Sequence, residues 1–198
     1  MTRTMVVAVF TVLMLVAIGP SHAKKPAWES LADCQYIEAK DNDGDSFRVR
    51  CAEKGFVLRL YFVDAPETNL SNAERTRQQA SHFGITLDET MRAGEKATEA
   101  VASALAKPFV VHTRWSGGGG RSREPRYSAL VEFGGKSLAE MLVSEGLARA
   151  MHTTVNLPDG KKGKAYVERL EVLEREAQRK RLGAWATSTR KGSDSQPK

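Results

Sequence analysis

Alternation of apolar and polar residues through residues 47–63 limits the possible folds more than any other feature of the sequence. A period of two is typical of β-strands, and Gly44 and Gly55 mark turns between the alternating runs. The apolar set that shares one face of each run is Phe47, Val49, Cys51, Leu58, Leu60 and Phe62. Residues 34–64 are therefore predicted to form three strands.

The remaining chain predicts helices and two further strands. Thr86 and Glu89 make a capping-box pattern, and apolar residues then recur every three or four positions as far as Leu105. The other predicted elements are strands at 109–115 and 127–133, a short helix from a second capping box at 137–140 to Gly146, and a last helix at about 163–182. This order is compatible with an α+β fold, a five-stranded OB-fold Greek-key barrel with about three α-helices.

Residues 1–23 have the pattern of a secretory signal peptide. Arg3 precedes an apolar run at 5–18, and small residues lead to a cleavage point after Ala23. A retained membrane anchor is the alternative, but the run is shorter than the ~20 residues of a spanning helix. We expect a secreted or periplasmic protein, monomeric and without stable membrane association after cleavage. The predicted parts are a signal peptide at 1–23, an extension at 24–33, one domain at 34–186 and a disordered tail at 187–198.

The chain has two cysteines, Cys34 and Cys51, at equal distances from a predicted turn at 42–43. Strand arms on the two sides of such a turn would bring them opposite each other, so we predict a cross-strand disulfide in an oxidising compartment. Two reduced, buried cysteines are the alternative. A zinc site is not expected, because no further cysteine and no paired histidine spacing accompanies them.

Charged residues gather where two of the predicted strands begin or end. Arg59, Asp64 and Glu67 come from the third strand and its exit, and Asp45 closes an acidic turn. Carboxylates from two strand ends could meet around one hard divalent cation, and a guanidinium group could face a phosphate. Because Arg59 and Asp64 are an odd number of residues apart, this requires a bend near residues 63–66. The net charge of +6 is compatible with a nucleic-acid substrate.

The alternate aspartates of the acidic turn also raise the possibility of an EF-hand loop. Position six of that loop would be Ser46 rather than glycine, and position twelve would be Ala52 rather than glutamate. The flanking segments show strand rather than helix patterns, so the EF-hand is excluded.

The two charged segments resemble the signature segments of the staphylococcal nuclease (thermonuclease) family. The likeness covers roughly residues 36–185 and includes residues 43–46, 59–67, 126–131, 135–136, 145–148 and 182–185. It implies the OB fold and a calcium cofactor. The roles that it implies are metal binding by Asp45, Asp64 and the backbone carbonyl of Ala65, orientation or deprotonation of the attacking water by Glu67, and phosphate binding by Arg59 and Arg126. Arg123 could compete with Arg126, but the spacing to the later glycines favours Arg126.

The sequence departs from the family pattern at the nucleotide-contact tyrosines. Glu124, His152 and Thr154 stand in those places, so the preferred base and the substrate affinity stay open. The connection at 69–90 is longer than the family's and includes Arg75, Arg77 and His82. It is predicted as a solvated loop or short helix, with substrate contact as the alternative.

The resemblance implies an exported calcium-dependent nuclease that hydrolyses DNA and RNA with low sequence specificity. Water would displace the 5′-oxygen and leave 3′-phosphate ends. The alternatives are a non-catalytic OB-fold module that binds single-stranded nucleic acid and a secreted calcium-binding structural domain. The retained acidic and arginine residues favour the nuclease, because a binding module has no need of them.

Overall fold

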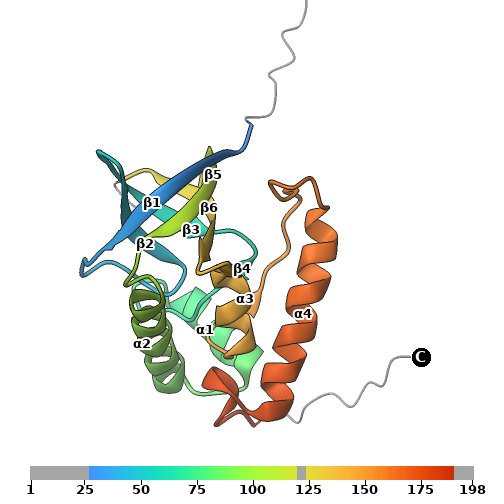
Figure 1. Cartoon of the computed structure of the whole chain (residues 1–198). Helices are drawn as coiled ribbons and strands as arrows, with labels where there is room; N and C mark the ends of the chain where they lie inside the picture. The colour runs from blue at the N-terminus through green and yellow to red at the C-terminus, as the bar shows by residue number, and fades with distance from the viewer. Residues whose placement is uncertain (1–26, 120–123, 190–198) are drawn as a thin grey trace, which may run out of the picture.

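The computed structural model describes residues 27–119 and 124–189 of the 198-residue chain. Five of its strands close into a barrel: the sheet order is β3-β2-β1-β5-β6-β7, and an additional parallel pairing of β3 with β6 joins the two sides (Figure 1). The strands are β1 (Glu29–Ile37), β2 (Ser46–Cys51), β3 (Lys54–Leu60), β5 (Phe109–Gly117), β6 (Arg126–Phe133) and the short β7 (Lys136–Ser137). The predicted α+β fold with an OB-type barrel is confirmed.

The alternating residues of β2 and β3 face the barrel interior as predicted. Phe47 and Leu58 are fully buried, and Val49 and Leu60 are nearly so. Arg59 stands between Leu58 and Leu60 in β3, so its side chain lies on the face of the strand that points away from the barrel interior. Burial of these apolar side chains supplies the main stabilisation of the barrel.

Cys34 of β1 and Cys51 of β2 form the predicted disulfide. The register of the two antiparallel strands, in which Gln35 lies opposite Arg50, brings the cysteines to facing positions. The disulfide therefore joins the two arms on either side of the acidic turn.

Helices cover the lower end of the barrel in Figure 1, and α4 (Gly163–Lys180) also runs up beside it. They are α1 (Ala73–Phe83), α2 (Leu87–Ala104), α3 (Leu138–Ser144) and α4 (Gly163–Lys180), followed by the 3-10 helix η1 (Gly183–Trp185). The capping box of Thr86 and Glu89 begins α2 as predicted, with both reciprocal hydrogen bonds present. The described residues thus form four α-helices where about three were expected, and the additional one, α1, lies in the connection predicted as a loop or short helix.

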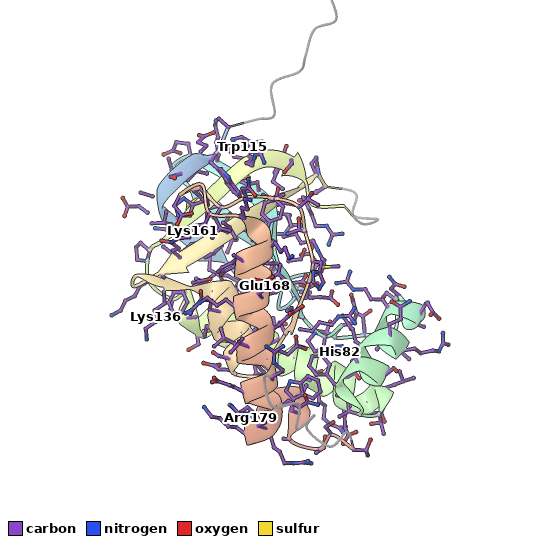
Figure 2. All side chains as sticks on the ribbon, turned by 90° about the vertical axis from the view of Figure 1, so that its right-hand side faces the viewer. His82, Trp115, Lys136, Lys161, Glu168 and Arg179 are labelled. Carbon is purple, nitrogen blue, oxygen red and sulfur yellow. A yellow bond between two sulfur atoms is a disulfide. The ribbon has the colours of Figure 1, made fainter. Side chains whose placement is uncertain are left out.

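Helix α1 packs beside α4. Figure 2, which looks onto α4, shows His82 at the junction of the two helices. Its Nε2 lies 2.6 Å from a carboxylate oxygen of Glu174. A second contact with Trp185, whose ring centroid is 5.5 Å from that of His82, extends the junction to η1. This packing fixes α1 against the rest of the molecule.

The predicted signal peptide and the final nine residues of the predicted tail lie outside the described residues. Ser188 and Thr189, at the start of that tail, donate hydrogen bonds to the backbone carbonyls of Phe83 and Gly84. Within residues 27–119 and 124–189, no helix is both long and apolar enough to cross a membrane.

Candidate active site

A sharp turn after β3 brings Arg59 and Asp64 together. Strand β3 ends at Leu60, and Phe62 adopts a left-handed conformation with φ of 71°. The chain then enters β4 (Val63–Asp64), which pairs with β8 (Arg149–Ala150) outside the barrel sheet. Nη2 of Arg59 lies 3.4 Å from Oδ1 of Asp64. The chain therefore bends at Phe62, one residue before the segment 63–66 in which the bend was predicted.

Asp45 is the one residue of the acidic turn that enters this site. The carboxylate of Asp43 instead accepts hydrogen bonds from the backbone amides of Asp45 and Ser46, at 3.0 and 2.6 Å, and so caps the turn. Asp41 pairs with Arg48 at the surface. The turn thereby presents the side chain of Asp45, which is 2% exposed, to Arg59.

The carboxylate of Asp45 is incompletely hydrogen-bonded. Its Oδ2 accepts hydrogen bonds from Nη2 of Arg59 at 3.1 Å and from the backbone amide of Ala65 at 3.0 Å. Its Oδ1 lies 3.0 Å from Nη1 of Arg59 but receives no well-aligned hydrogen bond, although it is buried. Burial raises the pKa of Asp45 to about 7, the negative charge of Asp43 adds to the rise, and Arg59 opposes it.

Asp64 is 1% exposed, and its two oxygens face different partners. Oδ2 accepts hydrogen bonds from Nε of Arg149 at 2.8 Å and from the side-chain amide of Gln79 at 3.1 Å. Oδ1 is paired with Nη2 of Arg75 and lies near Arg59. A buried carboxylate is stable only with partners of this kind, because removal from water without them is costly.

Glu67 extends the site toward the surface. Its side chain is 21% exposed, and Nε of Arg75 lies 2.8 Å from its Oε1. Burial raises the pKa of Glu67, and the positive charge of Arg75 opposes the rise. The same carboxylates act on Arg75 in turn: burial lowers its pKa, but Asp64, Asp45 and Glu67 outweigh burial and raise it.

Gln79 of α1 links the segments on the two sides of Pro66. Its amide nitrogen donates to Asp64 and, at 2.8 Å, to the carbonyl of Ala65, while its oxygen accepts from the backbone amide of Glu67 at 2.8 Å. The side chain is fully buried. Gln79 thus holds the side chain of Asp64 and the backbone of Ala65 and Glu67 relative to one another.

Arg126 lies beside the carboxylate cluster without touching it. It belongs to β6, where it pairs in register with Val57 of the neighbouring β3. Its guanidinium donates to the carbonyl of Gly119 and, at 3.1 Å, to the hydroxyl of Ser46. A Cβ added at Gly118 would meet the Cβ atoms of both Arg59 and Arg126, at 3.1 and 3.3 Å, so the two arginines flank one point of the chain.

Two of the three positions of the absent tyrosines, Glu124 and His152, contact charged side chains at the surface. Glu124 pairs with Arg48 at 2.6 Å, and His152, whose side chain is 82% exposed, lies 3.1 Å from Glu171. Arg123, the competitor of Arg126, lies outside the described residues.

The sequence reasoning named Arg75 only as a possible substrate contact and missed Gln79 and Arg149. Arg75 and Gln79 are four residues apart, so α1 places them on one face, but neither a cap nor an apolar stripe marks this helix in the sequence. Arg149 is the first residue of the two-residue strand β8, and no sequence pattern marks it. The described part of the chain holds no group of three or more His, Cys, Asp or Glu side chains arranged to bind a metal ion.

The family model for staphylococcal nuclease homologues matches residues 57–187, about two thirds of the chain. A search of curated proteins found no match. The matched region contains Arg59, Asp64, Glu67 and Arg126, whereas Asp45 precedes it and is associated with the site by the geometry alone. The chain belongs to the staphylococcal nuclease family.

Proposed function

We propose that the protein is an exported, calcium-dependent nuclease that hydrolyses phosphodiester bonds of DNA and RNA with low sequence specificity and leaves 3′-phosphate ends. The observation that carries the proposal is the meeting of two almost fully buried carboxylates, Asp45 and Asp64, with Arg59 between them and Glu67 at the rim. Such a cluster costs folding free energy, which a catalytic role would explain.

The donor groups fit a hard divalent cation. Asp45, Asp64 and the carbonyl of Ala65 would supply oxygen ligands, the type that Ca²⁺ prefers. Oδ1 of Asp45 is buried and lacks a well-aligned hydrogen bond, which is the state expected of an oxygen that has a further partner to bind. The bound ion would supply positive charge that stabilises the phosphate during attack and favours ionisation of water.

The protein groups would then divide the chemistry among them. Glu67 would orient the attacking water and accept its proton, for which a partly buried carboxylate of raised pKa is suited. Arg59 and Arg126 would bind the phosphate oxygens, because planar guanidinium groups can bind two oxygens at once. The P–O5′ bond would break as the P–O(water) bond forms. The 5′-oxygen would take a proton from solvent water, and Glu67 would return the proton of the attacking water to solvent.

Export is supported by the disulfide of Cys34 and Cys51, since disulfides persist in oxidising compartments. We therefore propose a secreted or periplasmic location, and a monomer as the working form.

The deciding experiment measures hydrolysis of fluorescently labelled single-stranded DNA by the purified protein in calcium, in chelator, and for Glu67→Gln in calcium. We expect cleavage to require calcium and to fall by about 10²–10⁴-fold in Glu67→Gln, the usual contribution of a general base. Glu74→Gln is the matched control, because Glu74 is 70% exposed and, among the residues that the structure describes, pairs with its helix neighbours alone.

End-group analysis of the products should find 3′-phosphates. Cleavage that persists in chelator would contradict the calcium assignment. DNA binding without cleavage would instead support the non-catalytic OB-fold module. That alternative draws on one observation, the replacement of the nucleotide-contact tyrosines by Glu124, His152 and Thr154.

A further inference from the structure

Arg75 contacts all three carboxylates of the candidate active site. Its Nη2 pairs with Asp64 and lies 3.4 Å from Oδ2 of Asp45, while its Nε lies 2.8 Å from Glu67. Among the residues that the structure describes, no other cationic side chain is paired with these three together; Arg59 reaches Asp45 and Asp64. Nη2 of Arg75 therefore lies between the two buried aspartates, where it contacts the same two oxygens as Nη2 of Arg59.

The charges at the site are already balanced by the protein. When Asp45, Asp64 and Glu67 are all ionised they carry three negative charges, and the three arginines paired with them are Arg59, Arg75 and Arg149. A divalent cation that binds the same aspartate oxygens would lie next to these guanidinium groups, where like charges repel. Binding of the cation and the present position of Arg75 therefore oppose each other.

Arg75 is the arginine best placed to leave. Arg59 extends from the barrel strand β3, is 13% exposed and is held by both oxygens of Asp45. Arg149 binds the other oxygen of Asp64, on the side of Gln79. Arg75 comes from α1, outside the barrel, and its side chain is 26% exposed, so rotation toward solvent requires no change in the barrel.

We propose that Arg75 is a built-in competitor of the divalent cation: its guanidinium closes the site by bridging Asp45, Asp64 and Glu67, and the cation displaces it. Displacement removes the Arg75 partner from Glu67, which is then available to the water. The proposal rests on the proposed function, and it makes Arg75 an autoinhibitory residue that sets the calcium concentration at which the site opens.

The test is calcium binding without nucleic acid, measured by isothermal titration calorimetry on the wild-type protein and on Arg75→Gln. An opposite charge at such distances changes the proton affinity of a carboxylate by roughly 10- to 1,000-fold. Because Ca²⁺ binds the same oxygens, we expect Arg75→Gln to bind it at least about tenfold more tightly. Arg77→Gln is the matched control, because Arg77 lies on the same helix, is 62% exposed and, within residues 27–119 and 124–189, pairs with Glu74 alone.

Arg75→Lys covers the case in which Arg75→Gln does not fold, as judged by circular dichroism. Lysine keeps the charge but cannot form the forked contacts of arginine, so its calcium affinity should lie above that of the wild type by a smaller factor. If the wild type binds calcium and both Arg75 variants bind it equally or more weakly, this inference is overturned and the proposed function is not. Absence of calcium binding in the wild type and in folded variants would overturn the calcium assignment of the proposed function, and this inference with it.

Discussion

At the scale of single residues, Gln79 connects the parts of the site that follow β3. It is fully buried, and its amide contacts Asp64, the carbonyl of Ala65 and the amide of Glu67. Because donor and acceptor are joined in one planar group, these contacts restrict the backbone around Pro66 relative to Asp64. Gln79 is therefore a positioning residue: it holds Asp64, Ala65 and Glu67 in place and takes no direct part in the proposed reaction.

Replacement of Gln79 by leucine should lower both stability and turnover. The change leaves buried polar groups without partners, each at a cost of about 1–3 kcal/mol in the free energy of unfolding. Because Glu67 and Ala65 lose their restraint, kcat should fall more than KM rises. Urea unfolding and steady-state kinetics check this, with Gln78→Leu, exposed on the same helix, as the control. Lower stability with unchanged kcat would show that Gln79 has a structural role only.

The difference between Arg59 and Arg75 shows what the sequence can predict at this scale. An arginine in an alternating apolar strand, followed by two carboxylates at the strand exit, indicates a site because no packing need explains it. Arg75 lies in a polar segment where arginine is ordinary, and its partners depend on how α1 packs on the barrel. The main carboxylates could therefore be predicted, whereas the group that neutralises them could not.

At the scale of elements, the strands and α2 followed from local rules. Side-chain alternation and the Thr86–Glu89 capping box need no knowledge of tertiary packing. Helix α1 has no side-chain hydrogen bond at its N-cap, Asn72, and its buried residues include the polar Thr76 and Gln79. Its stability comes from tertiary partners, so neither a cap nor an apolar stripe marks it in the sequence.

Helix α2 supports the site through close backbone contact at Gly94. A Cβ at this position would lie 2.5 Å from the carbonyl oxygen of Pro66 and 2.8 Å from that of Glu67. Backbone atoms cannot move aside as a side chain does. The absence of a side chain at Gly94 therefore allows the segment that carries Glu67 to rest on the helix.

Substitution of Gly94 by alanine should consequently impair both folding and catalysis. Alanine favours the helix by up to ~1 kcal/mol over glycine, but the overpacking should cost about 1–3 kcal/mol and displace the backbone of Glu67. A displacement near 1 Å can lower the rate by about 10²-fold. Thermal unfolding and kcat would measure the two effects, with Lys96→Ala, exposed on the same helix, as the control. A stabilised Gly94→Ala protein with full activity would contradict the packing argument.

At the scale of the whole molecule, the disulfide encloses the turn that presents Asp45. Cys34 and Cys51 are 17 residues apart, and the turn that Asp43 caps lies between them. The bond therefore restricts the part of the barrel that holds one buried carboxylate. In the unfolded chain the disulfide restricts the conformations of the same segment. This loss of conformational entropy in the unfolded state is the usual explanation of how a disulfide stabilises a protein.

Reduction of this disulfide should lower the free energy of unfolding by about 3 kcal/mol, the value typical of a loop of this length. Urea unfolding of the oxidised and reduced protein would measure the difference as a shift of the midpoint. The double variant Cys34→Ser, Cys51→Ser should unfold near the reduced wild type and should not respond to reductant. At urea concentrations well below the unfolding transition, the reduced protein should stay active, because the β1–β2 hydrogen bonds and the Asp43 cap remain. If reduction leaves the midpoint of urea unfolding unchanged, the strand pairing of the barrel alone holds the turn. If the folded, reduced protein loses activity, the disulfide itself positions Asp45.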